Sequence, residues 1–76
     1  MTKLPVVSGR QAAKAFGRIG YELDHQTGSH MILRQSFLPH RRLTIPDHKE
    51  LSKGTLRAII REAGLSVDEF ARLLKL

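Results

Sequence analysis

The sequence predicts an α+β domain in which three antiparallel strands form one sheet and helices cover one of its faces. A capped amphipathic helix begins near residue 8, and three short strand-like segments follow between residues 21 and 46. Apolar residues at helical spacing return from residue 56 onward. The chain has 76 residues with no internal repeat or linker, so we expect residues 1–76 to form a single domain.

The first helix has a defined start and end. Ser8 is followed three residues later by Gln11, which fits a capping box in which each side chain satisfies the backbone N–H of the other residue. Ala12 and Phe16 lie four residues apart and mark the buried side of the helix. Gly20 is the predicted end, because glycine readily adopts the left-handed conformation that terminates helices.

Three strands are predicted next. They cover residues 21–26, 30–34 and 42–46. In the first strand Tyr21, Leu23 and His25 alternate with more polar residues, which is the period of a half-buried strand. The segment Thr27–Ser29 is a turn, and Pro46 ends the third strand because proline has no N–H for a sheet ladder. The face of the sheet away from the helices would be free to meet a partner.

The segment from Gln35 to His40 reads as a loop because it contains Pro39. Its Phe37 and Leu38 are apolar, which is unusual for a loop. Two alternatives follow: the two side chains tuck inward, or they form an exposed apolar patch.

The C-terminal third predicts two helices after a polar loop at residues 47–52. The strongest helical pattern of the chain is formed by Leu56, Ile59, Ile60 and Ala63. Gly64 ends this helix. Ser66 and Glu69 form a second capping box, which begins a short extra helix at the C-terminus. That helix is lined by Phe70, Leu73 and Leu74.

The charge indicates a polyanionic partner. Thirteen Lys and Arg residues against seven Asp and Glu residues give a net charge of +6. Residues 41–61 hold six basic and two acidic residues, whereas residues 62–76 hold two basic and three acidic ones. We expect no membrane partner, because no apolar run approaches the roughly 18 residues of a membrane span. The chain has no cysteine, which fits a reducing, cytoplasmic location.

Several kinds of catalysis are disfavoured by the residues. The absence of cysteine excludes a thiol nucleophile, and Ser29 and His30 are neighbours on a strand, which places their side chains on opposite faces. The segment Lys53–Thr55 lacks the preceding glycines of a phosphate-binding P-loop. The four histidines do not show the spacing of helical metal sites, so we expect neither a metal site nor a cofactor.

Histidine and cationic side chains remain. RNA carries its own nucleophile, the 2′-hydroxyl, and a histidine that takes its proton can promote cleavage without a metal. His30 follows Gly28, where the backbone can approach a phosphate closely, and it opens a strand, which is a rigid platform. A purely structural role at the strand end is the alternative for this histidine.

Three segments of the chain resemble the HicA-type mRNA interferase toxins. The run Gly28-Ser29-His30 between two strands resembles their active-site motif. Thr44-Ile45-Pro46-Asp47-His48 resembles the end of their third strand, and residues 53–66 resemble their second helix and the turn that follows. The chain departs from the family at residues 35–42, where many members have a short polar turn.

The resemblance implies an α-β-β-β-α fold like that of double-stranded-RNA-binding domains. It implies a toxin that cleaves mRNA and a HicB-type antitoxin that covers the active site. Carried over to this chain, it makes His30 the catalytic general acid or base, with Gly28 and Ser29 in the active-site turn. The second proton carrier stays open between water, His48 and a lysine.

Parts of the sequence also bear on binding to nucleic acids without cleavage. Arg34, Lys53 and Arg57 are candidates for binding RNA phosphates. A non-catalytic module that binds double-stranded RNA is the alternative function, since it needs the same fold and charge. Direct binding to DNA through a helix-turn-helix is not expected, because Asp68 and Glu69 would begin the recognition helix and repel phosphates.

Overall fold

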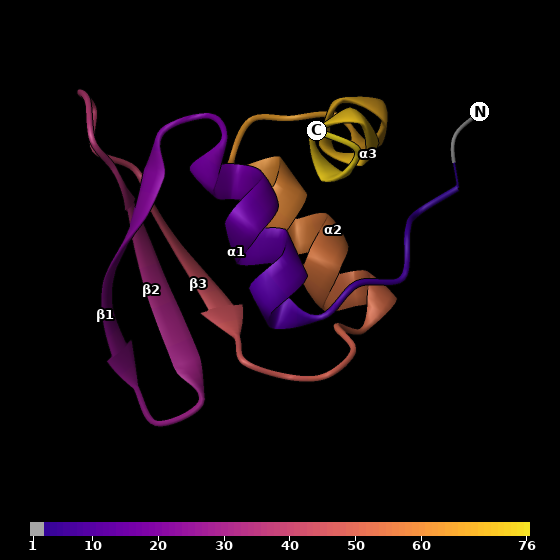
Figure 1. Cartoon of the computed structure of the whole chain (residues 1–76), viewed down its shortest axis with the longest axis horizontal. Coiled ribbons are helices and arrows are strands. Elements are labelled where there is room, and N and C mark those ends of the chain that lie inside the picture. The colour runs from indigo at the N-terminus through magenta and orange to yellow at the C-terminus, as the bar shows by residue number, and fades with distance from the viewer. Residues whose placement is uncertain (1–2) are drawn as a thin grey trace.

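The computed structural model describes residues 3–76 and forms two layers, a sheet and a set of helices (Figure 1). The elements, in chain order, are α1 Gly9–Gly17, β1 Tyr21–Thr27, β2 His30–Gln35, β3 Arg42–Pro46, α2 Lys53–Glu62 and α3 Val67–Leu74. The strands form an antiparallel sheet in the order β1-β2-β3. This confirms the predicted α+β class, the three-stranded antiparallel sheet and the short C-terminal helix. Within residues 3–76, no helix has the length and apolar character needed to cross a bilayer.

The helix starts follow the capping signals. Ser8 and Gln11 form the expected capping box at α1, and Ser66 and Glu69 form the one at α3. The start of α2 was not predicted from a cap, yet the side chain of Ser52 accepts a hydrogen bond from the Thr55 N–H there. Side-chain caps of this kind supply partners to N–H groups that the helix itself leaves free.

Both predicted helix-ending glycines have left-handed backbone conformations. Gly20 has φ +99°, and Gly64 has φ +77°. After α2, the Leu65 N–H donates to the Ile60 carbonyl at 3.1 Å, which is the bond that defines a Schellman end.

The core lies between the sheet and the helices. From the sheet it receives Met31, Leu33, Leu43 and Ile45. Helices α1 and α2 lie over this face, and α3 packs across both helices (Figure 1). Phe70 of α3 is fully buried against Phe16 of α1, with ring centroids 5.1 Å apart. These two rings join the last helix to the first.

The prediction that β1 is half-buried was wrong. Tyr21 is buried, but Leu23 is 58% exposed and His25 is also exposed. The register with β2 shifts between Leu23 and His25, so Asp24 forms a β-bulge. A bulge interrupts the alternation of faces, and β1 is an edge strand whose later residues have no helix over them.

The Gln35–His40 loop combines both alternatives. The ring of Phe37 lies against Gly20, where an added Cβ would be 2.5 Å from a ring carbon, and half of the residue remains exposed. Leu38 is 79% exposed. The loop therefore tucks one apolar side chain against the turn after α1 and presents the other to solvent.

Candidate active site at the β1–β2 hairpin

The Gly28-Ser29 turn joins β1 to β2 as a two-residue hairpin. Thr27 pairs with His30 across it, and Gly28 has φ +57° whereas Ser29 does not have a positive φ. A positive φ at the first central residue alone is the pattern of a type II′ turn, which matches the twist of antiparallel strands. The geometry of the turn therefore requires glycine at position 28.

His30 is exposed on the face of the sheet that carries no helix. It is the first residue of β2 and pairs with Pro46 of β3. Met31, the next residue, is buried against the helices, so the alternation along the strand directs His30 to the opposite face. This face is called the open face below. Solvent and a large substrate can reach an imidazole in this position.

Backbone and side-chain bonds tie the turn to the end of β3. The Asp47 N–H donates to the Ser29 carbonyl, at 2.6 Å. The side-chain amide of Gln26 donates both to the Gly28 carbonyl, at 3.1 Å, and to the Asp47 carboxylate, at 3.3 Å. Ser29, the residue before His30, is thus bonded directly to the residue that follows β3, and the turn is held by both a backbone and a side-chain contact.

Asp47 also anchors the first turn of α1. The guanidinium of Arg10 donates two hydrogen bonds to its carboxylate, at 3.1 and 3.3 Å. These bonds, followed by smaller effects of Arg10 charge and of Gln26, hold the pKa of Asp47 below its ordinary value. The carboxylate is therefore charged at neutral pH, and the contact persists there. Fork-shaped pairs of this type fix geometry as well as charge.

Gly9 brings the start of α1 close to the same point. Its N–H donates to the His48 carbonyl at 2.9 Å, and a Cβ at this position would lie 1.9 Å from the Pro46 carbonyl oxygen. Only glycine permits this approach. In Figure 1 the β1–β2 turn, the end of β3 and the starts of α1 and α2 all lie toward the lower side of the molecule.

The predicted cationic residues are divided between two sides of the sheet. Arg34 lies four residues after His30 on β2, so both side chains share the open face. Arg42 pairs with Arg34 across the strands. Lys53 and Arg57 are exposed on α2, which packs on the other face. The fold thus groups Arg34 with His30 and leaves the two α2 residues apart from them.

The other histidines have distinct surroundings. His25 Nδ1 is paired with the Asp24 carboxylate at 2.8 Å, and His40 Nδ1 donates to the Gln35 carbonyl at 3.0 Å. His48 is exposed and directly follows Asp47, the residue that bonds to the hairpin turn. No group of three or more His, Asp or Glu residues within 3–76 is arranged to hold a metal ion.

The Arg10–Asp47–Gln26 contacts were missed by the sequence reasoning. Arg10 and Asp47 are separated by 37 positions, and nothing in their local pattern pairs them. The one available signal was the Pro46-Asp47-His48 segment, whose resemblance to a family motif pointed to the region but not to this contact.

A family model described as the HicA toxin of bacterial toxin–antitoxin systems matches residues 9–65. The chain belongs to the HicA toxin family. The match begins with α1, covers the whole sheet and ends just after α2. A search of curated proteins found no match.

Membership in the HicA family gives the hairpin site its context. HicA proteins are the toxins of toxin–antitoxin systems and pair with HicB antitoxins. The order α-β-β-β-α-α of this HicA chain agrees with the fold of double-stranded-RNA-binding domains. The Gly28–His30 turn and the Asp47 contacts all lie inside the matched region.

Proposed function

We propose that this HicA chain is an endoribonuclease that cleaves mRNA in the cytoplasm, with His30 as a general acid or base. One observation carries the proposal: the histidine of the Gly28-Ser29-His30 motif is exposed on the open face, at the end of a hairpin bonded to Asp47. A rigid, accessible imidazole is what proton transfer to or from a bound RNA strand requires.

The proposed chemistry uses the substrate's own nucleophile. His30 takes the proton of a 2′-hydroxyl as its oxygen attacks the adjacent phosphorus, and the 5′-oxygen leaves with a proton from a second carrier. The products are a 2′,3′-cyclic phosphate and a 5′-hydroxyl end. No metal is needed to generate the nucleophile, and a cation beside the phosphate stabilises the developing charge. His48, water and a lysine are the candidates for the second carrier.

The proposed RNA contacts begin with Arg34, which shares the open face with His30. Lys53 and Arg57 are proposed to contact parts of the RNA that pass the α2 side of the domain. A HicB-type antitoxin is the proposed partner that covers His30. An acidic surface on that partner would complement the net charge of +6.

The test is cleavage of a defined mRNA by wild-type protein and by His30→Ala and His30→Gln, with and without a chelator. We expect cyclic-phosphate ends from wild type only, in equal amounts with and without the chelator. Loss of a positioned general base typically costs about 10²–10⁴-fold in rate. Equal cleavage by wild type and His30→Ala would refute the role of His30, and loss of activity with the chelator would refute the metal-free mechanism.

The alternative function is a module that binds double-stranded RNA without cutting it. The fold itself favours this candidate, since double-stranded-RNA-binding domains recognise A-form helices by shape. The alternative predicts salt-dependent binding of duplex RNA by wild type and His30→Ala alike, with intact RNA recovered afterwards and no growth arrest on expression.

A further inference from the structure

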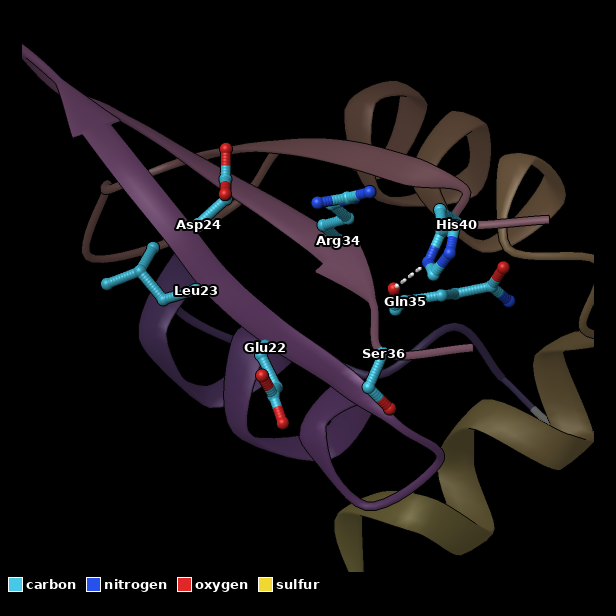
Figure 2. Close-up of a pocket in the computed structure, with 7 residues that line it drawn as sticks. All are labelled: Glu22, Leu23, Asp24, Arg34, Gln35, Ser36 and His40. Carbon is cyan, nitrogen blue, oxygen red and sulfur yellow. Dashed lines mark hydrogen bonds between the residues drawn. The ribbon is translucent and has the colours of Figure 1, made fainter. Parts of the chain in front are cut away.

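A small pocket lies between β1 and β2, on the same sheet as His30 (Figure 2). Its volume is about 150 Å³. The lining consists of Glu22, Leu23, Asp24, Arg34, Gln35, Ser36 and His40. In Figure 2 the guanidinium of Arg34 extends from β2 into the space between Asp24 and His40. The pocket thus brings carboxylates, a guanidinium and a hydroxyl to one place.

The bulge at Asp24 forms one wall of this pocket. Because Asp24 has no partner in the β1–β2 register, its side chain is free of the regular alternation. The hydrogen bond from His25, and the charges of Arg42 and Arg34, hold the pKa of Asp24 below its ordinary value. Bulges are frequent beside functional sites, where they redirect a side chain. The strand therefore presents a charged hydrogen-bond acceptor here.

Arg34 provides the matching donors. It forms no salt bridge shorter than 4.0 Å with any residue in 3–76, so its guanidinium N–H groups are available to a ligand. Arg42 stands directly opposite it on β3. Like charges in register destabilise a sheet, and Asp24 supplies an opposite charge that both arginines feel.

The size and position of the pocket indicate what it can hold. Pockets for drug-sized ligands are roughly 300–1,000 Å³, so this one suits a single planar ring system. Arg34 is four residues from His30 along β2, which is about 13 Å at strand spacing. An RNA strand that crosses the open face with its phosphate at His30 would therefore bring a nearby base to this pocket.

We propose that this pocket binds one unpaired base of the RNA strand that is cut at His30, and that it gives cleavage a preference for guanine at that position. The proposal rests on the ribonuclease function proposed above. Arginine donates to the O6 and N7 acceptors of guanine, and carboxylates accept from ring and exocyclic N–H groups. Single-stranded RNA exposes these edges, whereas a duplex hides them. The substrate class is therefore single-stranded mRNA.

The experiment maps cleavage sites in a pool of RNA with a randomised, unstructured segment. The proteins compared are wild type, Arg34→Gln, Arg34→Lys and Asp24→Asn, with Arg72→Gln as the control because Arg72 is an exposed arginine on the remote helix α3. Wild type and Arg72→Gln should favour guanine at one fixed distance from the cut, by roughly 5- to 150-fold. Arg34→Gln and Asp24→Asn should lose the preference because cleavage beside guanine falls toward the rate of the other sequences. Arg34→Lys should also lose it, since lysine keeps the charge but lacks the fork.

Three results would overturn the base-binding pocket. They are a wild type without preference at any position, an unchanged preference in Arg34→Gln, and an equal slowing of all sequences, which would make Arg34 a phosphate contact only. The second of these results is the one expected if the pocket contacts a protein partner instead of a base. Absence of cleavage by wild type, or equal cleavage by His30→Ala, would instead refute the ribonuclease function, so the two failures are distinguishable.

Discussion

Replacing Gly9 with alanine is expected to destabilise the domain by moving α1 away from β3. The added Cβ would lie 1.9 Å from the Pro46 carbonyl oxygen, and real Cβ contacts are essentially never below 3.0 Å, so the backbones must separate by at least 1.1 Å (3.0 minus 1.9). Overpacking of this kind costs about 1–3 kcal/mol. Breaking the Gly9–His48 hydrogen bond would lower the free energy of unfolding by about a further 1 kcal/mol.

The expected total is about 2–4 kcal/mol, a large part of the roughly 5–15 kcal/mol that stabilises a small domain. At about 4–8 °C per kcal/mol, even the lower value lowers Tm by about 8–16 °C. Thermal unfolding followed by far-ultraviolet circular dichroism measures this directly. Gly17→Ala is the matched control, since nothing lies within 4 Å of its added Cβ and alanine favours the helix by about 0.5–1 kcal/mol.

A Gly9→Ala protein as stable as wild type would refute the close approach of α1 to β3. Because alanine itself favours the helix, a fall in Tm of both glycine variants would mean that the loss of stability is not specific to the contact of Gly9 with Pro46. Below its lowered Tm, the Gly9→Ala protein should still have reduced RNA cleavage, because Pro46 pairs with His30 and Asp47 holds the hairpin turn.

Three further predictions follow from other contacts. Tyr21→Phe should be as stable as wild type or more stable in urea unfolding, because the buried Tyr21 hydroxyl has no hydrogen-bond partner in the described residues; a clear loss of stability would contradict this. Gly28→Ala should destabilise by about 1–2 kcal/mol through its left-handed φ alone, since its added Cβ meets nothing within 4 Å, and an unchanged Tm would contradict it. Because Arg10 lowers the pKa of Asp47, that contact stabilises the fold above the unfolded pKa of about 3.9 and is lost as pH falls through the lower folded value. Unfolding measured from pH 7 to pH 2 should therefore show a weaker acid dependence in Asp47→Asn than in wild type, and identical curves would refute the role of this pair.

The fold could be predicted largely because its signals are local. The capping boxes at Ser8 and Ser66 each lie within four residues, and the glycines that end α1 and α2 need only a favourable backbone conformation. The Gly28 turn fixed where β1 meets β2, and so where His30 begins its strand. Features that depend only on residues a few positions apart are little affected by what packs against them.

The exposure of β1 and the contacts of Asp47 could not be predicted because they depend on tertiary packing. The alternation of apolar and polar residues in β1 is compatible with burial of one face. In the structure only Tyr21 at the start of β1 is buried, and the bulge at Asp24 interrupts the alternation. Arg10 reaches Asp47 only because Gly9 allows α1 to touch the end of β3. The location of His30 was predictable, whereas its catalytic role stays a prediction.

The family model matches residues 9–65, but the hydrophobic core also includes residues of α3 beyond this match. Phe70 of α3 packs on the fully buried Phe16, and Arg18, the C-cap residue of α1, donates to the Leu73 carbonyl at 2.6 Å. A fragment cut at the edge of the pattern would leave the Phe16 ring facing water and expose an aggregation-prone surface. We therefore expect a chain cut before α3 to lose stability although His30 itself is untouched, because α3 completes the core on which the sheet rests.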